Sequence, residues 1–423
     1  MNLVLKRLKT EWPGWMVLAF FALLPFGRFS EIPLSVFALS LPFLWRSSEH
    51  QARIRQIALV LVPLFLCFWL PMVISSFDSY LPEKSSLRSL AALRYPAAAL
   101  SVAVLLKAGS SHWRVLRWTS YLLVFWAIDG FIQLFTGTDV FGVAMHPDRL
   151  NAMFVRQYQF YGPTLAMLSP LLLEYARRRW PPWAWMTSFG LILGAVLIAG
   201  MRSGWLIMGL VMVVYLLQML NRENRQIRFA TVSIPVLALG VILAGYMVSP
   251  LFQDRVDQSL QAFEGTGAAV DFASSERLPI FSTAIRMYAA HPVNGVGVRA
   301  FPVAYPEFAE PGDIHVLKSG GDIGAKHAHN LVLEVLADTG TIGLAGLLVG
   351  LVLMFGFWRN MRPAHRQEAF PYLLALVLIL FPVNSHFAIY GTYLSSLIWM
   401  LLGLWAATYP HVTPAHVSLL DDS

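Results

Sequence analysis

The sequence is poor in charge and nearly free of cysteine. Charged residues make up 13% of its 423 residues and apolar residues 57%, whereas soluble domains carry roughly 25% charged and about 45–50% apolar residues. This deficit of charge excludes a single water-soluble globule, and the apolar content excludes a disordered chain. The one cysteine, Cys67, cannot form a bridge within the chain, so a disulfide-stapled fold is excluded as well.

Several sequence patterns of enzyme sites are also missing. The chain has no glycine-rich Walker loop, no Cys/His spacing typical of zinc, no Asp-x-Asp metal–nucleotide motif and no Gly-x-Ser-x-Gly elbow. A glycosidase-like carboxylate pair is not evident, although Asp271, Glu276, Asp313 and Asp322 leave that alternative open. In a membrane protein, a net charge of +7 more often reflects basic cytoplasmic loops than binding of nucleic acid. We therefore expect no metal, no cofactor and no nucleic-acid partner.

Long apolar runs dominate the sequence instead. A membrane-spanning helix needs about 20 such residues, and twelve runs are candidates, at 13–27, 32–45, 57–78, 89–106, 118–136, 158–175, 183–200, 204–220, 229–249, 341–358, 370–385 and 390–408. They predict an all-α polytopic membrane protein with about twelve transmembrane helices. The first run lacks a convincing small-residue cleavage site, so we expect it to stay as a signal anchor.

Basic residues predict the orientation of these helices. With the N-terminus in the cytoplasm, the cytoplasmic segments hold eighteen of the 31 lysines and arginines, and the short outer loops hold six. This asymmetry is typical of the positive-inside rule. We therefore expect four parts: helices one to nine over 1–249, an external loop domain with amphipathic helices over 250–340, helices ten to twelve over 341–408, and a cytoplasmic tail over 409–423.

The external loop carries one recognisable helix signal. Ser274 and Ser275 precede apolar residues at helical spacing between 280 and 288, and His291-Pro292 follows them. This pattern predicts an amphipathic helix that is capped by the serines and ends at His291. A turn is expected at 294–297, where the sequence is Asn-Gly-Val-Gly.

His329 is the first candidate for chemistry. It lies at the entrance of a predicted short helix, after Lys326 and before Asn330, and Gly340 suits the C-cap of that helix. A histidine titrates near neutral pH and can act as a general base. The structural alternative is a helix-capping or interfacial histidine, and the chemistry alone favours that alternative.

Arginines on the external side are the second candidates. Arg202 could bind a phosphate in bidentate fashion, or its side chain could extend to lipid headgroups beside Trp205. Arg277 has the same two interpretations, with Glu276 or a phospholipid as its structural partner. Arg156 is a weaker third candidate. A basic site without metal ligands indicates an anionic substrate that arrives already activated.

Arg94 lies inside the fourth predicted span, where a charge is costly and usually functional or paired. Asp129 in the fifth span is its obvious partner. We favour a structural ion pair between the two over a role of Arg94 in ligand binding.

These motifs together resemble a known family. His329-Asn330, nine residues, Gly340, two residues and Gly343 are similar to the H-[NSQ]-x9-G-x-x-G signature of the bacterial O-antigen ligases, within the O-antigen ligase/polymerase superfamily. The Arg-Ser-Gly turn at 202–204 resembles the family's arginine turn. Arg277, its helix and the run 291–297 resemble a second family stretch. The similarity rests on motifs over 200–346 and only on architecture before that.

The resemblance implies a membrane-embedded, GT-C-like glycosyltransferase in the bacterial inner membrane, with its active site facing the periplasm. It implies O-antigen polysaccharide on undecaprenyl pyrophosphate as donor, lipid A–core as acceptor, contact with membrane lipids, and no metal. Arg202 and Arg277 would stabilise the pyrophosphate leaving group, and His329 would deprotonate the acceptor hydroxyl for an inverting displacement. Candidate further substrate contacts are Arg156, Arg94, Lys326 and Asn330, and the structural motif residues are Gly340 and Gly343.

Three alternatives stay open. An O-antigen polymerase would share the donor but use another lipid-linked glycan as acceptor, and a protein-directed oligosaccharyltransferase would use a polypeptide. From another class, a polytopic transporter or flippase of lipid-linked glycans would suit the number of spans. A transporter would show broken spans with midplane charges and two similar halves, and the sequence shows neither clearly.

Overall fold

The protein is described here by a computed structural model, which covers residues 2–106, 110–154, 158–220, 225–261, 275–382 and 387–410. These residues are almost entirely helical, as the sequence predicts. Extended pairing among them is limited to the isolated bridges Thr138–Ala144 and His146–Arg149.

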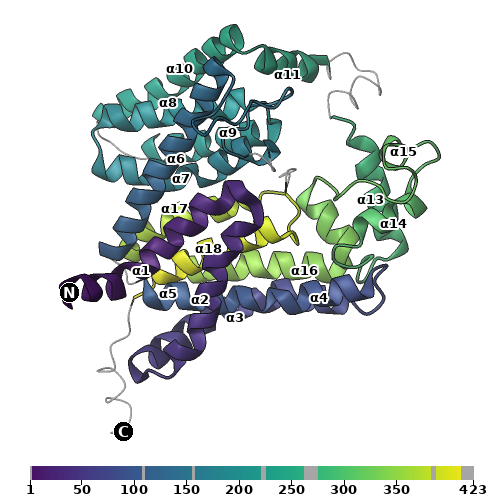
Figure 1. Ribbon diagram of the computed structural model, residues 1–423, viewed down its shortest axis with the longest axis horizontal. Helices are drawn as coiled ribbons and strands as arrows, with labels where there is room; N and C mark the ends of the chain where they lie inside the picture. Colours follow the sequence, from purple (N-terminus) through teal and green to yellow (C-terminus); the bar gives the residue numbers. More distant parts are fainter. Residues whose placement is uncertain are drawn as a thin grey trace.

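Figure 1 shows how the helices are arranged in space. In chain order they are α1 (Asn2–Leu23), η1 (Leu24–Ser30), α2 (Glu31–Trp45), α3 (Ser48–Ile74), α4 (Pro82–Ala92), α5 (Arg94–Leu105), α6 (Ser110–Thr136), η2 (Tyr158–Phe160), α7 (Tyr161–Arg179), α8 (Pro182–Ile198), α9 (Arg202–Leu220), α10 (Arg225–Val248), α11 (Pro250–Leu260), α13 (Leu278–Ala290), α14 (Phe301–Phe308), α15 (Ile314–Lys318), α16 (Leu331–Arg359), α17 (Pro363–Ile379) and α18 (Thr392–Ala407).

Each of the twelve predicted spans contributes residues to a helix, but the helices differ in their ability to cross a membrane. Among the described residues, 5 helical stretches are long and apolar enough, or up to 6 if a bent pair counts as one span. They are Glu11–Trp45, Ser48–Ile74, Ser111–Thr136, Arg202–Met219 and Leu331–Arg359, with the bent pair Ser233–Val248 and Pro250–Leu260. The chain is thus a polytopic membrane protein, and twelve crossings stay a prediction.

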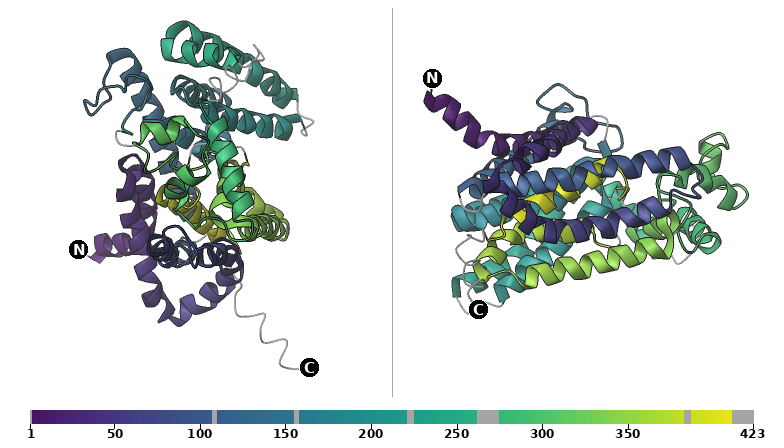
Figure 2. Two further views of the ribbon diagram at one scale, coloured as in Figure 1. Left: turned by 90° about the vertical axis from the view of Figure 1, so that its right-hand side faces the viewer. Right: turned by 90° about the horizontal axis from the view of Figure 1, so that it is seen from below.

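The helices form a bundle with a smaller unit, α13–α15, at one end (Figure 2). The N-terminal end of the chain lies at the opposite end of the bundle. The end of α18 lies beside the start of α3, because Arg53 donates hydrogen bonds to the carbonyl oxygens of Tyr409 at 2.8 Å and Pro410 at 2.9 Å. The predicted cytoplasmic and external segments therefore lie at opposite ends of the molecule.

The α13–α15 unit has its own small hydrophobic core. Ile280, Met287, Phe301 and Tyr305 are buried in it, and the Tyr305 hydroxyl donates a hydrogen bond to Asp313 at 3.0 Å. The predicted amphipathic helix is α13, which ends at Ala290 before His291. Its predicted serine cap is wrong for Ser275, because the N-cap residue is Arg277 and the Ser275 hydroxyl binds Arg202 instead. Ser274 lies outside the described residues.

Candidate active site

A bend in α16 joins the α13–α15 unit to the bundle. The bend is at Gly340, whose φ of 62° lies in the left-handed region that favours glycine. Beyond it, the Thr341 amide leaves the helix pattern and donates to the Pro292 carbonyl at 2.8 Å. The Val296 amide donates to the Ala337 carbonyl, also at 2.8 Å. The 291–297 turn and the two motif glycines therefore belong to one packed joint.

Gly343 serves the same joint through a close side-chain contact. A Cβ atom at this position would collide with the hydroxyl of Thr339. That hydroxyl lies 2.8 Å from the Tyr390 hydroxyl, close to the start of α18. Glycine at residue 343 thus lets α16 pack against the segment that leads into α18.

His329 lies at the entrance of α16 in a strained backbone conformation. Its φ is 51°, which is uncommon for a residue other than glycine and is concentrated at functional sites. The helix cap is Asn330, whose side chain accepts a hydrogen bond from the Leu333 amide at 3.1 Å. The imidazole of His329 packs against that of His327, with ring centroids 3.9 Å apart. The capping role considered for His329 therefore belongs to Asn330.

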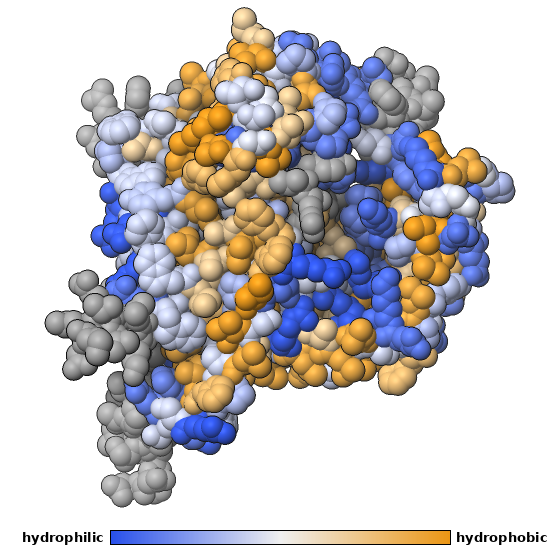
Figure 3. Space-filling model, in the orientation of Figure 1, coloured by the Kyte–Doolittle hydropathy of each residue, from blue (hydrophilic) through white to orange (hydrophobic). Residues whose placement is uncertain are grey.

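His327 and Lys326 line a polar cavity of about 500 Å³. Its walls come from the bend between α1 and α2, from η2, from the loops before α14 and α16, and from the segment before α18. The lining residues are Gly27, Arg28, Ser30, Glu31, Gln159, Phe160, Arg299, Pro302, Lys326, His327, Phe387, Ala388, Gly391, Thr392, Tyr393 and Leu394. On the face shown in Figure 3, hydrophilic residues gather near the centre, beside the α13–α15 unit, and apolar residues cover much of the surrounding surface.

The predicted ion pair between Arg94 and Asp129 is wrong. The Arg94 guanidinium pairs with Glu31 at 2.6 Å, not with Asp129. Asp129 instead accepts hydrogen bonds from the amides of Val140 at 2.8 Å and Met153 at 3.2 Å. These bonds hold the loop that follows α6 against that helix. Arg94 also stands at the break between α4 and α5, so it lies at a helix start and not inside a continuous span. Through Glu31, it borders the polar cavity.

The structure brings Arg202 and Arg277 together, with Arg149 as a third member. Burial, together with the charges of Arg202 and Arg149, lowers the pKa of Arg277 to about 10. Arg202 also donates to the hydroxyls of Ser259, at 3.3 Å, and Ser275. Three neighbouring guanidinium groups repel one another, and an anion bound among them would remove that repulsion. This arginine cluster, Arg149, Arg202 and Arg277, is suited to a phosphate-bearing ligand.

The arginine cluster and the polar cavity are neighbours in the fold. The cavity wall includes Phe160, and two residues later Gly162 packs tightly against Ala199 and Met201 of the turn that carries Arg202. The site thus has two parts, one made of arginines and one lined by Lys326 and His327, whose ring packs against that of His329. The remaining candidate, Arg156, lies outside the described residues.

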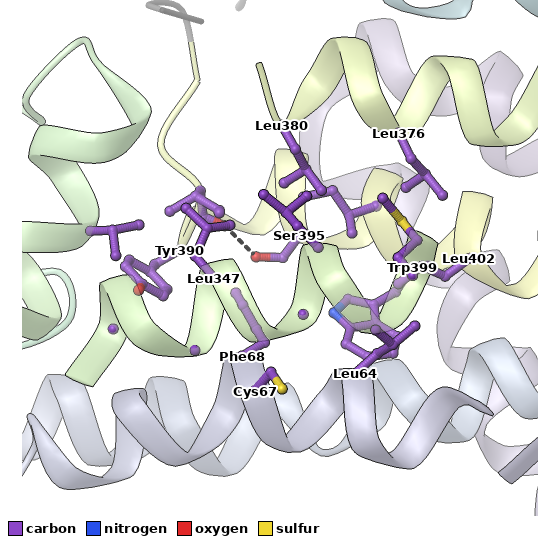
Figure 4. Close-up of a pocket in the computed structure, with 18 residues that line it drawn as sticks. Leu64, Cys67, Phe68, Leu347, Leu376, Leu380, Tyr390, Ser395, Trp399 and Leu402 are labelled. Carbon is purple, nitrogen blue, oxygen red and sulfur yellow. Dashed lines mark hydrogen bonds between the residues drawn. The ribbon is translucent and has the colours of Figure 1, made fainter. Parts of the chain in front are cut away.

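A cavity of the opposite character lies among the helices of the bundle, next to Gly343. It is lined mainly by apolar side chains of α3, α16, α17 and α18, among them Phe68, Leu347 and Trp399 (Figure 4). Tyr390 and Ser395 stand at one side of it, and the Ser395 hydroxyl donates to the Ile389 carbonyl at 2.9 Å. The cavity therefore offers an apolar space close to the joint that carries the histidine motif.

Comparison with known families finds a match over the part of the chain that carries the candidate residues. The family model described as O-antigen ligase matches residues 187–348. This match over part of the chain supports a relationship to the O-antigen ligase/polymerase superfamily. The matched stretch contains Arg202, Arg277 and His329, which confirms the resemblance predicted from their motifs. No curated protein matches the chain significantly. The match supports a glycosyltransferase-like membrane enzyme of the O-antigen ligase or polymerase group.

Two buried acids on α16 could not be assigned from the sequence. Glu334 accepts hydrogen bonds from the backbone amides of Ile389 and Tyr390, and Asp338 accepts one from the Arg299 amide at 3.3 Å. They stand one turn apart on α16, where acids in an apolar helix are a signal for a functional or paired charge. Arg299 lies close enough to both for its charge to act on them.

Among the described residues, no group of three or more histidine, cysteine, aspartate and glutamate side chains is arranged to hold a metal ion.

Proposed function

We propose that the protein is an O-antigen ligase. In this proposal it transfers O-antigen polysaccharide from undecaprenyl pyrophosphate onto lipid A–core at the periplasmic face of the bacterial inner membrane. The observation that carries the proposal is the arginine cluster, because mutually repelling guanidinium groups are suited to a pyrophosphate. The periplasm lacks nucleotide sugars and ATP, so a donor used there must bring its own leaving group.

The chemistry is a single displacement at the anomeric carbon of the donor. His329 accepts the proton of an acceptor hydroxyl, and the oxygen of that hydroxyl forms the new glycosidic bond. The bond between the anomeric carbon and the pyrophosphate oxygen breaks, and undecaprenyl pyrophosphate leaves with the electron pair. Arg202 and Arg277 stabilise its growing negative charge without a metal, an effect typically worth several kcal/mol. Attack from the side opposite the leaving group inverts the anomeric configuration.

The membrane part of the fold receives the lipid portion of the donor. The apolar cavity among α3, α16, α17 and α18 lies beside Gly343, at the joint that leads to His329. This cavity has a volume of about 90 Å³, so only a short part of the polyprenyl chain would enter it from the bilayer, where the lining is mainly hydrocarbon (Figure 4). In this proposal the chain crosses the membrane twelve times, has a GT-C-like architecture and carries the α13–α15 unit in the periplasm.

Deleting the gene and examining the lipopolysaccharide of the cell tests this proposal. A ligase predicts lipid A–core without O-chain, together with accumulated lipid-linked polymer. Lipid A–core that carries a single repeat unit would instead indicate the polymerase, which the superfamily also includes. Unchanged lipopolysaccharide would contradict both. The superfamily match favours an enzyme over the transporter alternative.

A further inference from the structure

The polar cavity carries an excess of positive charge. Arg28, Arg299 and Lys326 line it and are exposed within it. Glu31 is the one acid among the described residues of its lining, and Arg94 neutralises it through the 2.6 Å ion pair. Three cations thus face the cavity without an equal number of anions, a pattern that attracts a negatively charged ligand.

The same cavity has an aromatic wall. Phe160, Phe387 and Tyr393 line it and pack against one another, with ring centroids 4.4 Å apart for Phe160–Phe387 and 4.8 Å apart for Phe160–Tyr393. The Tyr393 hydroxyl lies 2.8 Å from that of Thr164, which fixes the ring. Flat aromatic surfaces next to polar groups suit the apolar faces and hydroxyl edges of sugar rings.

The backbone holds the cations of the cavity in place. Arg28 follows Gly27, whose φ of 68° turns the chain between α1 and α2. Arg299 has the same φ of 68°, and its amide is held by the buried Asp338. Such conformations persist only where the surrounding structure imposes them. The Glu31 Oε2 atom is engaged by Arg94, while its Oε1 atom is buried and has no hydrogen-bond partner among the described residues.

We propose that this cavity is the acceptor site, and that Arg28, Arg299 and Lys326 make it selective for an acceptor glycan that carries phosphate or carboxylate groups. The inference rests on the proposed transfer reaction. It assigns the donor pyrophosphate to the arginine cluster and the acceptor sugars to a separate set of residues. The aromatic wall holds the acceptor ring, and the three cations bind its charged substituents.

The test compares two acceptors that differ only in charge. Purified protein in phosphatidylcholine vesicles receives lipid-linked polysaccharide together with either lipid A–core or the same acceptor after its core phosphates have been removed. The wild-type kcat/KM should be roughly ten- to a hundredfold higher for the charged acceptor, as expected for charge-assisted hydrogen bonds. Arg28→Gln, Arg299→Gln and Lys326→Gln should each lower this ratio several-fold, and the double variant of Arg28 and Arg299 should bring it to about one.

Lys84 provides the matched control. It is an exposed cation on α4 and is not part of the cavity lining, so Lys84→Gln should keep the wild-type ratio. Arg299→Gln can impair folding because Arg299 adjoins two buried acids. Arg28→Gln and Lys326→Gln, each checked by its thermal midpoint, therefore provide independent tests.

Three results would overturn the inference. One is an equal wild-type kcat/KM for both acceptors. Another is that the glutamine variants raise the KM for the donor and leave the KM for the acceptor unchanged. The third is loss of the preference when anionic phospholipid is added, which would assign the cavity to lipid headgroups. Transfer to neither acceptor, with lipid-linked glycans extended instead, would contradict the proposed function, and the inference would fall with it.

Discussion

Arg277 is a cation held in surroundings that oppose its charge. Its pKa is lowered to about 10 by burial and by Arg202 and Arg149. An arginine whose pKa is lowered on folding destabilises the folded state at every pH at which it is protonated in both the folded and the unfolded state. This includes neutral pH. The penalty is lost only as the pH rises above about 10. The folded protein therefore carries an electrostatic cost that a bound anion can offset.

We predict that inorganic pyrophosphate raises the thermal midpoint of the purified protein by about 1–3 °C. Arg277→Gln should remove most of this rise, because one of the three charges that bind the anion is lost. Thermal unfolding in detergent measures both. Arg286→Gln is the control, since Arg286 pairs with the exposed Glu310 and should leave the rise unchanged. An equal rise in the Arg277 variant would show that the anion binds elsewhere.

The role of His329 predicts a pH dependence. A general base must be neutral to accept a proton, so transfer should fall as the pH is lowered and the base becomes protonated. His329→Asn should lower transfer by about two to four orders of magnitude and flatten this acidic limb. His50→Asn, at the opposite end of the bundle, should keep both the wild-type rate of transfer and the wild-type loss of transfer at acidic pH. Near-normal transfer by His329→Asn would leave His329 with a structural role only.

At the scale of the elements, α16 shows what local sequence can and cannot predict. The short helix after His329, its end at Gly340 and the following span were all expected, and the structure joins them into one bent helix. These features depend on neighbours in sequence, which a motif records. Arg28, Glu31 and Arg299 were missed because only the folded bundle brings the α1–α2 bend to the loop before α14. Arg94 was assigned the wrong partner for the same reason.

The bend itself can be tested with two glycines of the same helix. Gly340→Ala places a Cβ against the Val293 carbonyl and forces alanine to a φ of 62°, so it should destabilise the protein by about 1–3 kcal/mol and lower transfer. Gly356→Ala has no atom within 4 Å of the new Cβ and should be neutral or stabilising by up to about 1 kcal/mol. Chemical denaturation and transfer assays compare the two. Equal effects would mean that the bend does not position the site.

At the scale of the whole molecule, apolar runs predict helices better than they predict crossings. α7 and α18 are buried over most of their length, so neighbouring helices surround them in place of lipid. α18 has 16 residues and is shorter than a typical span. Apolar character alone cannot distinguish burial in protein from burial in lipid. The positive-inside pattern adds the orientation, and the opposite positions of the α13–α15 unit and the N-terminal end of the chain agree with it.

Labelling of engineered cysteines tests this orientation. In a background in which Cys67 is replaced by alanine, Glu310→Cys after α14 should react with a membrane-impermeant thiol reagent added outside the inner membrane. Asn360→Cys at the end of α16 should react only after the membrane has been made permeable to the reagent. Both Glu310 and Asn360 are exposed in the fold. The reverse pattern would place the α13–α15 unit in the cytoplasm.

The most direct test of the central claim is transfer by the purified protein. Vesicles that contain it, lipid-linked O-antigen polysaccharide and lipid A–core should form lipid A–core bearing the polysaccharide, with release of undecaprenyl pyrophosphate. This product should form at an undiminished rate in excess chelator, because Arg202 and Arg277 supply the positive charge that stabilises the leaving group. Failure to form the product, or loss of transfer in chelator that magnesium or manganese restores, would contradict the account.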